Sequence, residues 1–275
     1  MSSDAITAQS LQPAVDWEHP TPPTNLIFDD GEPLESNRHR IAMNVLIDSA
    51  LTALADRLDS FVGGNMFVYY SQNQAMNRDF RGPDFFVTLD VDGNRERQGW
   101  VVWEEEGRYP DVIVELMSSP STAKVDRTVK KELYERVFRT ADYFIFDPFK
   151  PTAFEGWHLT DRRYQSLVSN EQGWLWCETL GLWLGTWEGS VQREPPTGTC
   201  QWLRFYDREG HLVLLPEEAA SQRADQAERE KAGLLERLRA AGIDLGATNL
   251  SRDSRSLKAL SFVQSVPLYV GSRFG

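Results

Sequence analysis

The sequence predicts a mixed α/β (α+β) protein with a central mixed sheet flanked by helices, a C-terminal β meander and a long C-terminal helix. Three observations predict this class. In the middle of the chain, apolar runs at 112–116 and 143–146 enclose a helical pattern. After Pro151 the chain is rich in aromatic residues and interrupted by turn residues at short intervals. Residues 217–241 are polar, with alanine and leucine recurring at alternating spacings of four and three.

The first half of the chain predicts one helix and several short strands. Residues 38–60 carry aliphatic side chains at near-helical spacing, which predicts an amphipathic helix. The pair Gly63-Gly64 marks a turn, and the sequence MFVYY after it predicts a strand. A second strand is predicted at 84–91, and WVVWEEE indicates a short strand or an edge segment.

The segment that follows the 112–116 run is predicted to be a helix. Its N-cap is expected at Ser121 or Thr122, because hydroxyl side chains cap the first free amides of a helix. A row of apolar residues at spacings of four indicates one shared face: Val125, Val129, Leu133 and Val137. Further along, turns at Thr160-Asp161 and at 208–210 predict β-hairpins.

These patterns divide the chain into four parts. Residues 1–33 are rich in Pro, Asp, Ser and Thr and predict a flexible arm. Residues 34–215 form the folded domain, and 216–245 form a helix for which a solvated single helix and a coiled-coil dimer contact both remain open. Residues 246–275 continue no pattern, and no structure is predicted for them.

Composition restricts the function classes. A net charge of −12 argues against a protein that grips nucleic acid through phosphate contacts alone, although a nuclease with acidic metal ligands stays open. No run of 18 apolar residues occurs, and the N-terminus lacks the basic and apolar regions of a secretory signal. Two cysteines form neither a disulfide framework nor a metal motif, so we expect a cytoplasmic protein with free thiols.

Three residues could combine into a catalytic site. Glu115 interrupts a buried apolar run, where a carboxylate is costly unless it is paired. Asp84 opens the strand at 84–91, so the two carboxylates converge if these strands are neighbours. Carboxylate oxygens suit Mg²⁺ or Mn²⁺. Lys130, four residues after Asp126 and four before Tyr134, could stabilise charge on a phosphate.

These residues stand in motifs that resemble a known family. The chain shows RGPDFFV at 81–87, PDVIVELMSSPSTAKVDRTVKKELYE at 110–135, YFIFDP at 143–148 and LGLWLG at 180–185, and an Ala/Glu/Arg-rich C-terminal helix that ends in AAGIDL. Together they resemble the Uma-type restriction endonuclease family of the PD-(D/E)XK nuclease superfamily, over roughly residues 30–245. The superfamily usually has a lysine two residues after the second acidic residue, whereas this chain has Met117 there; the Uma-type branch moves the lysine into the next helix.

The resemblance implies a fold, a reaction and a set of residues. The fold is that of restriction endonucleases, with residues 34–215 as the nuclease domain. The reaction is hydrolysis of DNA phosphodiester bonds by a metal-bound water. Asp84 and Glu115 are implied as ligands of Mg²⁺ or Mn²⁺ and Lys130 as the catalytic lysine. The resemblance adds Glu35 as a further candidate ligand. Nucleic acid, most simply DNA, is the expected partner, and a homodimer would allow both strands to be cut.

Several alternatives remain open from the residues alone. Asp84 could simply shape a turn, Asp111 could be a second ligand or a loop residue, and Glu115 could form a structural ion pair with Lys130 or Arg127. Lys131 is a rival for the role of Lys130. Two other functions stay open: a nuclease-fold scaffold or binding protein without turnover, and a glycosidase with paired carboxylates. His39 is expected to be structural, and Tyr134 is expected to pack with a polar partner for its hydroxyl. The tryptophans at 157–202 are expected to belong to the core.

Overall fold

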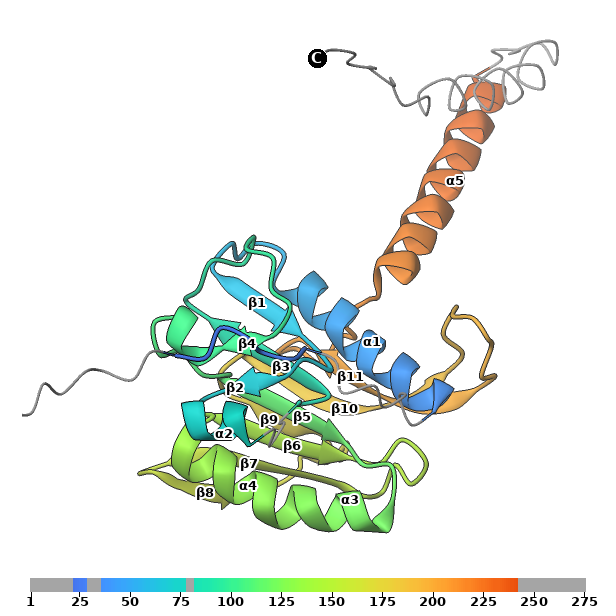
Figure 1. Ribbon diagram of the computed structural model, residues 1–275. Helices are drawn as coiled ribbons and strands as arrows, with labels where there is room; N and C mark the ends of the chain where they lie inside the picture. The colour runs from blue at the N-terminus through green and yellow to red at the C-terminus, as the bar shows by residue number, and fades with distance from the viewer. Residues whose placement is uncertain (1–21, 29–35, 78–81, 242–275) are drawn as a thin grey trace, which may run out of the picture. The chain divides into compact units, whose positions relative to one another are not determined.

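A central six-stranded mixed sheet organises the protein, and the computed structural model describes residues 22–28, 36–77 and 82–241 (Figure 1). The strand order is β1-β3-β5-β6-β7-β8, with β5 and β6 parallel and all other neighbours antiparallel. The strands are β1 (Ser60–Gly63), β3 (Phe85–Leu89), β5 (Val112–Leu116), β6 (Asp142–Phe146), β7 (Phe154–Thr160) and β8 (Arg163–Ser166). The predicted mixed sheet is therefore confirmed.

The first helix, α1 (Asn37–Ala53), ends earlier than the predicted 38–60. The Ser36 side chain caps it by accepting a hydrogen bond from the His39 amide at 3.1 Å. Its C-cap is Leu54, and the chain then turns into β1, which pairs with β3 instead of extending the helix. The predicted C-terminal boundary was wrong because Ser60–Gly63 completes an edge of the sheet, and strand pairing outweighs helical periodicity there.

The helical segment after β5 begins at Pro120 and ends at Phe138. It comprises α3 (Pro120–Val125), the π-helical turn η2 (Asp126–Lys130), α4 (Lys131–Leu133) and the π-helical turn η3 (Tyr134–Phe138). Ser119 is the N-cap, in a capping box with Thr122, so the predicted cap at Ser121 or Thr122 was wrong. Proline at the first helical position supports the earlier start.

The valines of the predicted face point largely to solvent. Val125, Val129 and Val137 are 43–53% exposed, whereas Asp126, Tyr134 and Phe138 of the same segment are buried. A π-helical turn changes the residue spacing of a helix and therefore which side chains share a face. The three valines thus form a surface stripe, whereas Leu133 packs against the core under this segment, and the side that meets the sheet carries Asp126 among aromatic residues.

Two apolar cores cover the two faces of the central sheet. One is formed by α1, the three-stranded sheet and alternate residues of the central strands, including Val112, Val114 and Leu116. The other lies under the helical segment 120–138 and includes Ile113 and Met117. Successive side chains of a strand point to opposite faces. Glu115 therefore belongs to the second face, among otherwise apolar neighbours.

The predicted β meander is a separate three-stranded antiparallel sheet, ordered β11-β10-β9. Its strands are β9 (Leu175–Cys177), β10 (Leu182–Gly189) and β11 (Cys200–Tyr206). The β7–β8 hairpin turns at Asp161 and Arg162, both with positive φ. The remaining short elements are β2 (Val68–Tyr69), which pairs in parallel with β4 (Trp100–Val101), the helix α2 (Gln72–Met76) and the 3-10 turn η1 (Val102–Glu104).

The last described helix, α5 (Pro216–Ala240), matches the predicted polar helix. The chain divides into two compact units, one that ends at Glu218 and one that begins at Ala219. The predicted four-part division stays a prediction, and 246–275 lies outside the described residues. Among the helices of the described part of the chain, none is both long enough and apolar enough to cross a bilayer.

Candidate metal and catalytic site

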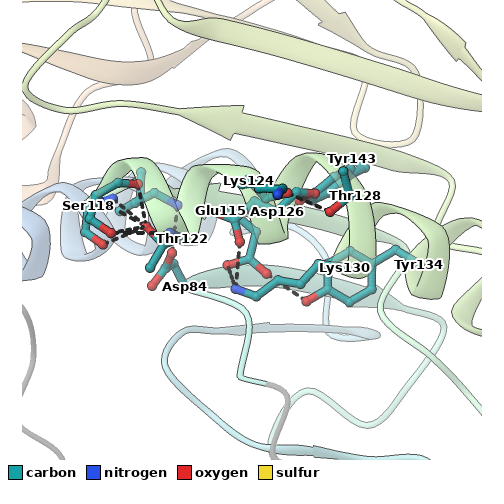
Figure 2. Close-up of polar contacts among 12 residues, drawn as sticks. Asp84, Glu115, Ser118, Thr122, Lys124, Asp126, Thr128, Lys130, Tyr134 and Tyr143 are labelled. Carbon is teal, nitrogen blue, oxygen red and sulfur yellow. Dashed lines mark hydrogen bonds and ion pairs between the residues drawn. The ribbon is translucent and has the colours of Figure 1, made fainter.

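Glu115 lies on β5 with no exposed surface, facing the helical segment 120–138. Its two carboxylate oxygens have different partners. Oε2 accepts a hydrogen bond from Lys130 Nζ at 2.9 Å, and Oε1 accepts one from the Tyr134 hydroxyl at 2.7 Å. Figure 2 shows these side chains gathered in one group with Asp84. The interruption of the apolar strand is thus compensated by two residues of the following helical segment.

Asp84 immediately precedes β3 and lies beside the same end of β5. The antiparallel register pairs Phe85 with Val114, so the next position along each strand is Asp84 on one and Glu115 on the other. Oδ2 of Asp84 accepts a hydrogen bond from the Leu116 amide at 2.7 Å. The predicted neighbourhood of the two strands is confirmed, and it brings the two carboxylates to one sheet edge.

Lys130 joins this group from the helical segment. Its Nζ lies 2.9 Å from Glu115 Oε2 and 3.0 Å from Asp126 Oδ1, so one ammonium serves two carboxylates. Asp126 begins the π-helical turn that ends at Lys130, which places the two side chains on the same side. Asp126 is 2% exposed, so the ammonium and both its acidic partners are withdrawn from most solvent.

The site gathers three acidic groups around one ammonium. Burial raises the pKa of Glu115 to about 8; Lys130 opposes this rise, and the charges of Asp84 and Asp126 add to it. Burial also raises the pKa of Asp126. Burial alone would lower the pKa of Lys130, but the carboxylates of Glu115, Asp126 and Asp84 raise it above its ordinary value. A raised carboxyl pKa favours the protonated form, so full ionisation of all three acidic groups around one ammonium is disfavoured unless a further cation is present.

The Tyr134 hydroxyl is a fixed donor to Glu115. The residue is fully buried, and its ring lies against Phe138 and Tyr143 at centroid distances of 5.1 and 5.2 Å. Burial and the charge of Glu115 raise the pKa of Tyr134 well above its ordinary value, so the hydroxyl keeps its proton. The expectation that Tyr134 packs and finds a polar partner is met, and the partner is the candidate ligand.

Other candidates from the sequence lie elsewhere. Asp111 is at the opposite end of β5, where its Oδ2 accepts hydrogen bonds from the Leu89 amide at 2.8 Å and from Arg108 at 3.3 Å. The structure therefore does not bring Asp111 to Glu115. Lys131 points away from the site, with its Nζ 4.0 Å from the centre of the Trp157 ring. Glu35 lies outside the described residues.

Arg127, the other pairing considered for Glu115, binds Glu155 instead. The Arg127 Nε to Glu155 Oε1 distance is 2.7 Å. Glu155 shares the sheet face of Glu115, because Glu115 pairs with Ile145 and Ile145 pairs with Glu155. This second carboxylate on the same face is more exposed, at 42% of its side chain, and has its own cation.

Sequence reasoning missed two members of the site. His39 was expected to be structural, yet its Nε2 lies 2.8 Å from Asp84 Oδ1; a carboxylate only accepts, so Nε2–H is the donor. Asp126 was noted only for its spacing from Lys130. A spacing of four before the lysine hinted at Asp126, whereas nothing in the local sequence links His39 to a residue 45 positions away.

The donor chemistry of this group fits a hard divalent cation. Mg²⁺ and Mn²⁺ prefer oxygen ligands, and Mg²⁺ commonly binds one or two carboxylates together with water and substrate phosphate. Asp84 and Glu115 supply such oxygens, and the neighbouring acidic groups, which add to the raised pKa of Glu115, favour an added cation. Across 22–28, 36–77 and 82–241, no three His, Cys, Asp or Glu side chains form a ready-made cage. The fit is thus to a site of two carboxylates, open to water and phosphate.

The chain is similar to one protein family and to a solved structure. The model of the Uma2 family, described as "Putative restriction endonuclease", matches residues 15–188, which is more than half of the chain. A similar solved structure is that of "a putative nuclease belonging to DUF820 from Anabaena variabilis ATCC 29413". It is 13% identical, with a TM-score of 0.38, and the match covers 58% of this chain and 86% of that chain. A search of curated proteins finds no match.

Proposed function

The chain belongs to the Uma2 family of restriction-endonuclease-like proteins, and on this premise we propose that it is a metal-dependent endonuclease that hydrolyses phosphodiester bonds of DNA. The observation that supports the site assignment is the meeting of Asp84, Glu115 and Lys130 at one edge of the central sheet. Residues from β3, β5 and the helical segment 120–138 contribute to this group. This meeting supports the assignment of the acidic pair and the displaced lysine to one site.

Each residue has a distinct proposed role. Asp84 and Glu115 would hold Mg²⁺ or Mn²⁺, which, when bound, supplies Lewis-acid activation of water and phosphate. Lys130 is the candidate to stabilise the negative charge that develops on the phosphate oxygens during attack. Tyr134 and the Leu116 amide orient the two carboxylates, because each donates to one of them. His39 donates to the second oxygen of Asp84.

The proposal extends to partners and location. A duplex substrate would bind with its phosphate beside Lys130, and cutting both strands would use a second copy of the chain. We propose a cytoplasmic enzyme, on the basis of the two free cysteines, one buried and one partly exposed. Neither the dimer nor the compartment affects the assignment of the site residues.

The central test is cleavage of plasmid DNA with Mg²⁺ or Mn²⁺ by pairs of matched variants. Glu115→Gln and Lys130→Met should each lower the cleavage rate by about 10²–10³-fold, because each removes a charge from the reacting centre. Glu155→Gln alters a carboxylate on the same sheet face, and Lys131→Met alters the adjacent lysine. Both should cleave within about threefold of the wild type.

Two results would count against this proposal, one against the site residues and one against the nuclease function. Equal cleavage by Glu115→Gln and the wild type would remove the site assignment. A second candidate function, a nuclease-fold binding protein without turnover, is favoured by one observation: both oxygens of Glu115 already have partners within the chain. Calorimetry with Mn²⁺ separates the two functions, since a folded protein that binds no Mn²⁺ supports the binding protein.

A further inference from the structure

Asp126 is a buried carboxylate that contacts the Lys130 ammonium. It is 2% exposed, and the partner of its carboxylate is the Lys130 ammonium, 3.0 Å from Oδ1. That oxygen accepts no hydrogen bond of good geometry from any residue that the structure describes. A buried carboxylate costs free energy unless it is well satisfied. Lys130, by contrast, already has a hydrogen bond to Glu115. Asp126 is therefore a second and less satisfied partner for the same ammonium.

The backbone around Asp126 is held in place. The Tyr143 hydroxyl donates to the Asp126 carbonyl oxygen at 3.0 Å, and Tyr143 is a buried residue of β6. Asp126 also starts the π-helical turn that ends at Lys130, a form of helix frequent at functional sites. The Asp126 carboxylate thus remains beside the Lys130 side chain whatever Glu115 binds.

We propose that Asp126 is a positioning residue that keeps the Lys130 ammonium in the site when Glu115 directs its carboxylate to a divalent cation. This inference rests on the proposed function. Glu115 cannot give its full negative charge to two cations at once, so its attraction for Lys130 weakens on metal binding. The Lys130 side chain is 23% exposed, which leaves the ammonium a route to solvent. The second carboxylate opposes that escape.

The proposal predicts a pattern of lysine reactivity that depends on metal. Lysine acetylation by an N-hydroxysuccinimide ester can be measured at each residue by peptide mass spectrometry, with the exposed Lys124 as an internal reference. In the wild type, Lys130 should stay at least tenfold less reactive than Lys124, with or without saturating Mn²⁺. In Asp126→Asn, Lys130 should be protected without Mn²⁺, because Glu115 still holds it, and should become about tenfold more reactive with Mn²⁺.

A matched variant and a kinetic readout accompany this measurement. Glu132→Gln removes an exposed ion pair with Arg136 on the same helical segment, and it should leave Lys130 protected in both conditions. With Mn²⁺ saturating, Asp126→Asn should lower kcat for plasmid cleavage by about tenfold or more, with KM within about twofold. A role confined to folding would not produce that separation of kcat from KM.

The outcomes distinguish the inference from the function on which it rests. No Mn²⁺ binding by the folded wild type would overturn both. Mn²⁺ binding with an equally protected Lys130 in Asp126→Asn would overturn the inference alone, as would equal exposure of Lys130 with and without Mn²⁺. Should Asp126→Asn not fold, the wild type still decides: a rise of Lys130 reactivity to the level of Lys124 on Mn²⁺ binding would refute the role of Asp126.

Discussion

The two ends of the parallel pair β5–β6 each bury a carboxylate completely, yet they do so in opposite ways. At the amino end, Asp142 accepts hydrogen bonds from His158 Nδ1 at 2.8 Å and from the Thr179 amide at 2.9 Å, with Cys177 Sγ 3.5 Å away. At the carboxyl end, Glu115 shares Lys130 with Asp126 and lies near Asp84. Asp142 has several donors to itself, whereas three carboxylates converge on one ammonium around Glu115.

This difference distinguishes a carboxylate with a structural arrangement, Asp142, from the candidate site residue Glu115. Asp142 links the central sheet to the β9–β10 connection through the Thr179 amide, and its two oxygens accept from donors that serve no second carboxylate in these contacts. The carboxyl end gathers three acidic groups around one ammonium, an arrangement that an added cation would stabilise. Burial alone does not identify a candidate site, since both residues have no exposed surface. What distinguishes the candidate site is that several acidic groups lie close to one ammonium.

The largest expected effect on stability is the difference between two amide variants, Asp142→Asn and Glu115→Gln. Asp142→Asn should lower the free energy of unfolding by about 3 kcal/mol, because it disrupts a buried hydrogen-bonded charge. It should leave cleavage per folded molecule unchanged. Glu115→Gln should change the unfolding free energy of the metal-free protein by less than about 1 kcal/mol near neutral pH, because burial raises the pKa of Glu115 to about 8 and the carboxyl is then largely neutral before the substitution. Urea denaturation measures both, and a larger loss of stability in Glu115→Gln would abolish the distinction between the two ends.

A slightly smaller effect should come from metal binding. At a Mn²⁺ concentration of about 100 times Kd, the wild type should gain about 2.7 kcal/mol of stability against unfolding. Asp142→Asn should gain a similar amount from its lower starting point, whereas Glu115→Gln should gain much less. Urea denaturation with and without Mn²⁺ tests this. An equal gain in Asp142→Asn and Glu115→Gln would place the metal somewhere other than the carboxyl end.

The smallest of the three effects concerns His39. His39→Leu removes the donor to Asp84 Oδ1 and should raise the Kd for Mn²⁺ about tenfold, because the carboxylate loses a group that orients it. His39→Gln can place an amide donor near the same oxygen and should restore part of the affinity. Calorimetric titration gives both values. Unchanged affinity in His39→Leu would show that His39 contributes to packing only.

Local patterns were sufficient for most elements of the fold. The central strands, the β7–β8 hairpin and the polar helix α5 all follow from apolar runs, turn residues and periodicity. Boundaries were less predictable. Helix α1 ended early because β1 forms an edge strand, and the helical segment began at Pro120 because Ser119 forms the capping box. The first correction depends on pairing with a distant strand, whereas the second depends on a local capping motif that the spacing of apolar residues does not report.

Some residues of the candidate site could be identified from local sequence patterns, and others could not. Glu115 could be identified from the sequence because a carboxylate within a buried strand requires a partner. Lys130 could be chosen over Lys131 by its spacing from Asp126 and Tyr134, and the structure places those residues together. His39 could not be found, since it reaches Asp84 only when α1 lies beside the start of β3. A contact between distant segments leaves no local pattern.

The amino-acid sequence by itself determined most of the strands and helices and the buried carboxylate that needed a partner, because side-chain period and the cost of burying charge are local properties. Only the tertiary structure decided which partners they obtained. It paired β3 with β5 so that Asp84 meets Glu115, and it turned Asp126 inward while leaving the valine stripe outside. The physical reason is that charge balance is set by distances through space, and those distances exist only once the sheet has formed.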